Sequence, residues 1–167
     1  MTTSLAWGDI DNDGDLDLAV GNGNFGVAVT APGSPNKLYE NVNGTFHEIW
    51  SDQINDSTTS VAWGDFNRDG WLDLAVGNYG QPNRLYENHN GTLTTLPAWS
   101  SVDADFTTSL AWGDLDNDGD LDLAAANAGG AEGRAIDADK IYGNNGDRFL
   151  SDPKYLWLAQ NNQNSYN

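Results

Sequence analysis

Residues 9–18 read DIDNDGDLDL, and the pattern returns as DFNRDGWLDL at residues 65–74 and as DLDNDGDLDL at residues 114–123. All three copies have the form D-x-[DN]-x-D-G-x-x-D, with oxygen-bearing side chains at positions 1, 3, 5 and 9. Calcium prefers about six to eight oxygen ligands, and a glycine at position 6 allows the tight turn that lets these side chains converge. The spacing therefore predicts three calcium loops.

The predicted ligands are of the same kind in each loop. Positions 1, 3, 5 and 9 would supply side-chain oxygens, and position 7 would supply a backbone carbonyl. The side-chain ligands are Asp9, Asp11, Asp13 and Asp17, then Asp65, Asn67, Asp69 and Asp73, then Asp114, Asp116, Asp118 and Asp122, and the carbonyl ligands are Asp15, Trp71 and Asp120. One ion in each loop gives three calcium ions per chain.

The residues on either side of the loops predict strands. A helix–loop–helix EF-hand needs a bidentate Glu at position 12. The residues at that position here are Val20, Val76 and Ala125. The segment after each loop alternates with period two, and a strand-like Ser-(Leu/Val)-Ala-Trp-Gly precedes each loop, at residues 4–8, 60–64 and 109–113. Each loop is therefore expected to connect the two strands of a β-hairpin.

The self-similarity extends beyond the loops. A Thr-Thr-Ser triplet begins each copy at residues 2, 58 and 107, so the offsets are 56 (58 − 2) and 49 (107 − 58). Third strands are predicted at 36–41, 83–88 and 139–144, and fourth strands at 45–50, 92–99 and from 148 onward, with an Asn-Gly turn between them. Four short antiparallel strands in each repeat are typical of the blades of a β-propeller.

These motifs resemble a known family. The Ala-Trp-Gly-Asp before each loop and the later Leu-Tyr-Glu-Asn followed by Asn-Gly-Thr are similar to FG-GAP/VCBS-type repeats, over nearly all of residues 2–157. Such repeats build the calcium-binding propellers of integrin α subunits, some fungal lectins and many secreted bacterial proteins. Two residues depart from the pattern: Asn67 replaces an Asp, and Gly143 replaces the Glu of the other repeats.

The predicted fold is all-β, with three propeller blades at residues 2–57, 58–106 and 107–157 and a C-terminal tail at 158–167. Propellers close with about four to eight blades, and repeats of this kind bury their core only by stacking on neighbours. Either the chain is a fragment of a longer protein, or copies associate to complete the ring. Two chains would give six blades in a homodimer near 36 kDa (2 × 18.0).

The composition excludes some partners. The formal charge is −18, from 25 acidic and 7 basic residues, and thirteen aspartates of the loops account for most of it. Three calcium ions would reduce the charge to −12 (−18 + 6). We expect no nucleic-acid partner, because binding to the phosphate backbone needs clustered Lys or Arg. There is no cysteine, and we expect neither a signal peptide nor a membrane span in this sequence.

No catalytic arrangement is predicted. The two histidines, His47 and His89, belong to no motif, and metal ligation accounts for most of the carboxylates. Trp7, Trp63 and Trp112 repeat in register with the loops, which favours packing within or between blades over a ring of sugar-binding aromatics. Because cytosolic calcium is low, loops of this kind favour an extracellular location.

Two functions remain open at this stage. The first is a calcium-stabilised, self-assembling interaction module, which binds other proteins or has a structural role. The second is a calcium-dependent lectin. Recognition would use the segments between the second and third strands, at residues 22–35, 79–82 and 128–138, unless their differences are neutral length drift.

Overall fold

The computed structural model describes residues 1–24, 33–128, 138–144, 146, 150 and 154–155, and within them it contains strands and no helix. The first sheet contains β1 (Thr2–Gly8), β2 (Asp17–Asn22), β3 (Lys37–Val42) and β4 (Thr45–Ser51). The second contains β5 (Thr58–Gly64), β6 (Asp73–Asn78), β7 (Arg84–Tyr86) and β8 (Trp99–Ser100). The third contains β9 (Thr107–Gly113), β10 (Asp122–Asn127), β11 (Lys140–Tyr142) and β12 (Lys154–Tyr155).

Each sheet is antiparallel, and its strands lie in the order in which they follow one another along the chain. The first two strands of each sheet pair in the same register, with Trp7 opposite Leu18, Trp63 opposite Leu74 and Trp112 opposite Leu123. The acidic loop therefore connects the same two strands in each sheet. The prediction of an all-β fold made of four-stranded antiparallel sheets is confirmed.

The predicted fourth strands are only partly correct. In the second sheet β8 contains two residues, and Leu93 forms only an isolated bridge to Asn88. Pro97 lies within the predicted strand and has no N–H to contribute to a ladder, which agrees with the shorter strand. In the third sheet the predicted start at residues 148–149 lies outside the described residues. The third strands β7 and β11 are also shorter than predicted, with three residues each.

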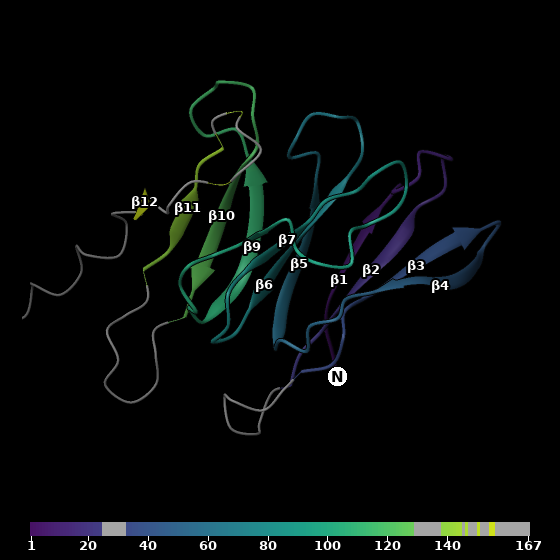
Figure 1. The fold of residues 1–167 in the computed structure, drawn as a ribbon, viewed down its shortest axis with the longest axis horizontal. Helices are drawn as coiled ribbons and strands as arrows, with labels where there is room; N and C mark the ends of the chain where they lie inside the picture. The colour runs from purple at the N-terminus through teal and green to yellow at the C-terminus, as the bar shows by residue number, and fades with distance from the viewer. Residues whose placement is uncertain (25–32, 129–137, 145, 147–149, 151–153, 156–167) are drawn as a thin grey trace, which may run out of the picture.

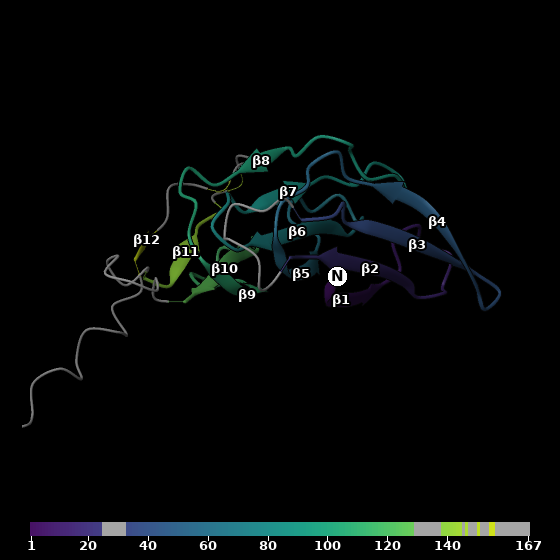
Figure 2. The same cartoon turned by 90° about the horizontal axis from the view of Figure 1, so that it is seen from below.

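The three sheets stand side by side as an open fan (Figure 1). Strand β5 contacts both β1 and β9, so the second sheet lies between the other two. The turned view shows β1, β5 and β9 along one edge of the arch and β4 and β8 along the opposite edge (Figure 2). The arrangement is propeller-like, and the sheets of the described residues do not close into a ring. The described residues include no helix with the length and apolar character needed to cross a bilayer.

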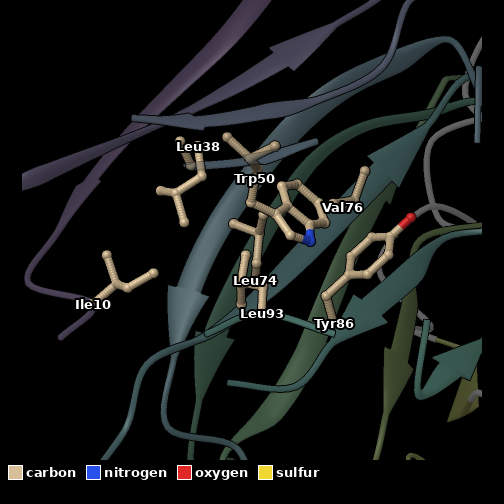
Figure 3. Packing of buried hydrophobic residues seen from close by; sticks show 9 residues of the cluster. Ile10, Leu38, Trp50, Leu74, Val76, Tyr86 and Leu93 are labelled. Carbon is tan, nitrogen blue, oxygen red and sulfur yellow. The ribbon is translucent and has the colours of Figure 1, made fainter. Parts of the chain in front are cut away.

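The core consists of side chains packed between neighbouring sheets. Between the first two sheets, Leu38 and Trp50 meet Leu74, Val76 and Tyr86 (Figure 3). The rings of Trp50 and Tyr86 are 5.1 Å apart in an edge-to-face arrangement. The second and third sheets repeat this arrangement, with the rings of Trp99 and Tyr142 5.0 Å apart. Burial of each large apolar side chain contributes about 1.5–3 kcal/mol to stability, so the stability depends on the contacts between sheets.

The repeated tryptophans also connect the sheets. Trp63 Nε1 donates to the carbonyl of Ala6 at 3.2 Å, and Trp112 Nε1 donates to the carbonyl of Ala62 at 3.3 Å. Packing between repeats is therefore observed for Trp63 and Trp112. Trp7 lies in the first of the described sheets, and 55 % of its surface is exposed.

Candidate metal centre

The three acidic loops have the same backbone turn. Position 4 of each loop has a positive φ, at Asn12 (59°), Arg68 (57°) and Asn117 (60°). The glycine at position 6 follows with φ of 97° at Gly14, 87° at Gly70 and 91° at Gly119. A non-glycine residue seldom adopts this left-handed conformation, and asparagine is the residue that tolerates it best. The two turns curl the loop, so that its side chains point inward.

The curl brings acidic groups together. In the first loop, carboxylate oxygens of Asp9, Asp11 and Asp17 all lie within 4.8 Å of one another. The third loop has the same cluster, formed by Asp114, Asp116 and Asp122. Positions 1, 3 and 9 of the predicted ligand sets therefore converge in these two loops.

The second loop has one carboxylate fewer but the same local geometry. Asn67 Oδ1 accepts a hydrogen bond from the backbone N–H of Asp69 at 3.0 Å. Asp11 Oδ1 accepts the equivalent bond from Asp13 at 3.2 Å. An amide oxygen thus lies where the first loop has a carboxylate oxygen, and it offers a ligand atom without the charge.

Backbone N–H groups orient the carboxylates at positions 1 and 5. Asp9 accepts from the N–H groups of Asp13 and Gly14, at 3.1 and 3.0 Å. The bonds are repeated at Asp65, at 3.1 and 3.0 Å, and Asp114 accepts from Gly119 at 3.1 Å. The position-5 residues Asp13, Asp69 and Asp118 accept from the N–H of position 7, which is Asp15, Trp71 or Asp120. Asp13 and Asp118 are not members of the tight carboxylate clusters.

The aspartate at position 9 is the buried anchor of each loop. Asp73 accepts from the backbone N–H groups of Phe66 and Asn88, at 3.0 and 2.8 Å, and it is fully buried. Asp17 and Asp122 accept the equivalent pairs of bonds. Burial raises the pKa of Asp73 to about 7, although its two N–H donors oppose the shift, and burial also raises the pKa of Asp17. A cation beside these groups would favour their charged form.

One asparagine at or just beyond the end of each third strand belongs to the site, and the motif analysis did not assign these asparagines this role. Asn41, Asn88 and Asn144 donate their backbone N–H to the position-9 aspartate of the same sheet. The amide nitrogens of Asn88 and Asn144 also donate, at 2.8 Å, to carbonyls in the loop of the preceding sheet, at Ile10 and Phe66. The signal was present in the sequence, because this asparagine occurs in all three repeats.

The loops also contact one another through position 4. Asn12 Nδ2 donates to the carbonyl of Gly70 at 3.2 Å, and Arg68 forms an ion pair with Asp120. Each contact joins one loop to the loop of the next sheet.

The donor set fits a hard divalent cation. The clustered groups offer only oxygen atoms, which is the chemistry that calcium prefers. Within the part of the chain that the structure describes, no lysine or arginine forms an ion pair with Asp9, Asp11 or Asp17. Three carboxylates so close together repel one another unless protons or a cation offset their charge.

The comparison with protein families agrees with this arrangement. A family model described as FG-GAP-like repeat matches residues 21–76 and 65–125, which together cover more than half of the chain. The chain belongs to the FG-GAP-like repeat family. The matched residues include the whole of the second and third acidic loops, and the first loop repeats their pattern ahead of the matched region. A search of curated proteins found no match.

Proposed function

We propose that this FG-GAP-repeat chain is a calcium-braced β-propeller module with a structural or interaction role. The observation that carries the proposal is the convergence of Asp9, Asp11 and Asp17, repeated at Asp114, Asp116 and Asp122. The same loop closes the same hairpin in all three sheets, which suits a brace that every blade needs. A catalytic group, in contrast, is needed only once.

Calcium would be held by the predicted ligands at positions 1, 3, 5 and 9 of each loop and by the carbonyl at position 7. The ion supplies positive charge, which offsets the repulsion among the carboxylates. The chain's own residues fix the geometry: the buried aspartates Asp17, Asp73 and Asp122 are held by backbone N–H groups, and the left-handed turn presents the remaining oxygens. Three ions per chain are expected.

The module is best understood as three blades, at residues 2–57, 58–106 and 107–157. A second copy of the chain would supply three more, giving a six-bladed homodimer. Such calcium loops suit an environment rich in calcium, so we place the protein outside the cell or at its surface. We assign it no catalytic activity.

A calcium-dependent lectin is the second candidate. The rings of Trp7 and Phe46 lie 5.9 Å apart at the surface of the first sheet, and exposed aromatic rings are a common platform for sugars. A glycan array in calcium and in chelator separates the two functions. Chelator-sensitive binding of a defined glycan would favour the lectin.

The calcium proposal is tested by titration calorimetry on the metal-free chain, together with thermal unfolding. We expect three calcium ions per chain and a marked fall in melting temperature in excess chelator. One site at a hundredfold excess over its dissociation constant adds about 2.7 kcal/mol. Fewer than two ions per chain at millimolar calcium, or a melting temperature that excess chelator does not lower, would refute the proposal.

A further inference from the structure

Neighbouring sheets fit together through a tryptophan and a glycine. The indole of Trp63 in the second sheet lies over Gly8 of the first, so that a Cβ added at Gly8 would lie 2.8 Å from Trp63 Cδ1. Trp112 of the third sheet covers Gly64 of the second, and a Cβ there would lie 2.7 Å from Trp112 Cδ1. Non-bonded carbon atoms do not approach so closely. A residue without a Cβ is therefore required at this position for the tryptophan of the next sheet to pack over it.

Among the residues that the structure describes, the third glycine and the first tryptophan have no such partners. A Cβ added at Gly113 meets no atom within 4 Å. A cavity of about 200 Å³ lies beside it, lined mainly by apolar groups that include Ala111, Leu115, Ala124 and Ile141. At the opposite end of the fan, Trp7 projects with 55 % of its surface exposed.

Other apolar side chains on the two outer faces show the same contrast. Leu5 is 57 % exposed, whereas Val61 and Leu110, its equivalents in the next two sheets, are 7 % and 8 % exposed. Leu115 on the third sheet is 63 % exposed, whereas Ile10 and Phe66 at the same position are each 1 % exposed. These residues are of the type that a neighbouring sheet covers elsewhere in the molecule, and exposed apolar patches of this kind mark interaction surfaces.

We infer that the outer face of the third sheet docks the first sheet of a second copy of this chain, with Trp7 seated over Gly113. The contact occurs twice, so it closes a ring with two-fold symmetry. The inference rests on the assembly half of the proposed function, and it supplies the contacting residues and their register.

The register follows from the contacts within the chain. Trp7 Nε1 of one copy donates to the carbonyl of Ala111 in the other, as Trp63 does to Ala6 and Trp112 to Ala62. Asn117 Nδ2 donates to the carbonyl of Gly14 in the other copy, as Asn12 does to Gly70. The tryptophan bond extends a contact seen at both interfaces, and the asparagine bond extends a contact seen between the first two sheets.

The polar groups favour a copy of this chain as the occupant. Ser4 Oγ accepts from the N–H of Val61, and Ser60 Oγ accepts from the N–H of Leu110, each at 3.1 Å. The next bond in this series would join the N–H of Leu5 on the first sheet of one copy to the hydroxyl of Ser109 on the third sheet of the other. Each end of the fan therefore has the group that the other end requires. The charge of −18 opposes association of two copies, so assembly should be stronger when calcium and salt reduce the repulsion.

Gly113→Ala separates docking from folding. Its Cβ enters open space in the single chain, and Gly113 is not among the glycines with positive φ, so the variant should fold and bind calcium normally. In the ring the same Cβ would strike Trp7 at both contacts, so we expect the dimer to weaken about 30-fold or more. Trp7→Ala should weaken it comparably. Leu96→Ala is the matched control, because it removes an exposed leucine from the connection between β7 and β8, which belongs to the middle sheet and not to either docking sheet.

The measurement is light scattering in millimolar calcium over a range of protein concentrations, with calcium stoichiometry determined on the same samples. We expect a mass near 36 kDa (2 × 18.0) for the wild type and Leu96→Ala, and monomers for Gly113→Ala and Trp7→Ala. An equal mixture of the two monomeric variants should recover dimer, because the pair retains one intact Trp7–Gly113 contact. Such recovery also excludes misfolding as the cause of the single-variant losses.

The outcomes are distinct. A wild-type chain that stays monomeric while binding three calcium ions overturns the docking and leaves the calcium proposal standing. A dimer that is unaffected by both variants overturns the register. A dimer of the expected behaviour that binds no calcium supports the docking and refutes the calcium proposal.

Discussion

Strands β1 and β5 have almost the same sequence and very different surroundings. They read TTSLAWG and TTSVAWG, so that only Leu5 and Val61 differ. Thr58 at the start of β5 is fully buried, whereas Thr2 at the start of β1 is exposed. The burial comes from the neighbouring sheets, because the local sequence is the same. Stability should therefore concentrate in the second sheet, which is covered on both sides, and decline towards the outer faces.

The largest expected effect tests whether the second loop is the central one. Asp73→Ala removes a buried acceptor of two backbone N–H groups as well as a proposed calcium ligand, and we expect a loss of about 3–5 kcal/mol. Asp17→Ala should cost less, because the second loop contacts neighbours on both sides. Denaturant unfolding in saturating calcium gives both values, and calorimetry counts the remaining ions.

Trp71→Ala is the matched control for Asp73→Ala. Only the backbone carbonyl of Trp71 is proposed to bind calcium, so this variant should retain all three sites. Loss of a calcium ion in Trp71→Ala, or an Asp17→Ala loss larger than that of Asp73→Ala, would contradict the comparison between the sheets.

The next effect compares tryptophans with and without a neighbouring sheet. Trp63→Ala should cost about 3 kcal/mol, because it empties the space over Gly8 and removes the bond to Ala6. Trp7→Ala should cost less than about 1 kcal/mol in the monomer. Both are measured in the Gly113→Ala background, which keeps the chain monomeric. Equal losses at the two positions would show that Trp7 is already packed within a single chain.

The third effect is a dependence on pH at the boundary between the first two sheets. Burial raises the pKa of Asp52 from 3.8 to about 6, although hydrogen bonds from Asn36 oppose the shift. A raised pKa means that the folded state binds the proton more tightly than the unfolded chain does. The contribution of Asp52 to stability therefore increases as the pH falls through 6, and it levels off below 3.8.

Asp52→Asn should abolish this dependence. In the second sheet the hydroxyl of Ser101 is the equivalent acceptor for the backbone N–H of Asn83, so that sheet has no titrating group at this position. Between pH 7 and 4.5 the wild type should gain about 2 kcal/mol relative to Asp52→Asn. Unfolding in saturating calcium at both pH values measures the difference. A constant difference between the two proteins would show that Asp52 titrates normally.

The smallest effect concerns the link between the second and third loops. Arg68→Asn replaces a strained arginine with the residue that the other two loops have, but it removes the ion pair with Asp120. The guanidinium is half exposed, so the net loss should be no more than about 1 kcal/mol and should shrink as salt is added. Unfolding at low and high ionic strength measures it. If the loss of stability in Arg68→Asn did not change with salt, Arg68 would stabilise the fold by something other than its charge.

The sequence predicted the local elements well, because their causes are local. Alternating residues and the loop spacing specify the hairpins, and Gly14, Gly70 and Gly119 adopt the left-handed turn expected of them. The predicted fourth strand at residues 92–99 was only partly correct, because this segment contains an isolated bridge at Leu93 and only the first residue of β8. The three calcium ions and the ring stay predictions.

The sequence could not reveal relations that depend on neighbouring sheets. Trp7 and Trp63 have the same local motif, and only the fan shows that one is covered and the other is not. The position-9 aspartates were assigned to the metal alone, yet the structure shows each also accepting two backbone N–H groups, one of them from the asparagine at or just beyond the end of the third strand. That asparagine was visible as a repeated letter, but its contacts arise from folding across the sheets.

The asparagine bonds between sheets set an order of events during synthesis. Asn88 reaches Ile10, and Asn144 reaches Phe66, and each bond spans 78 residues of chain. At a translation rate of about 5–20 residues per second, a loop waits about 4–16 s for the asparagine that holds it. The first hairpin must therefore remain unaggregated on the ribosome while its partner is made. Its dense negative charge destabilises the finished fold through self-repulsion. During synthesis the same charge would keep the nascent chain soluble.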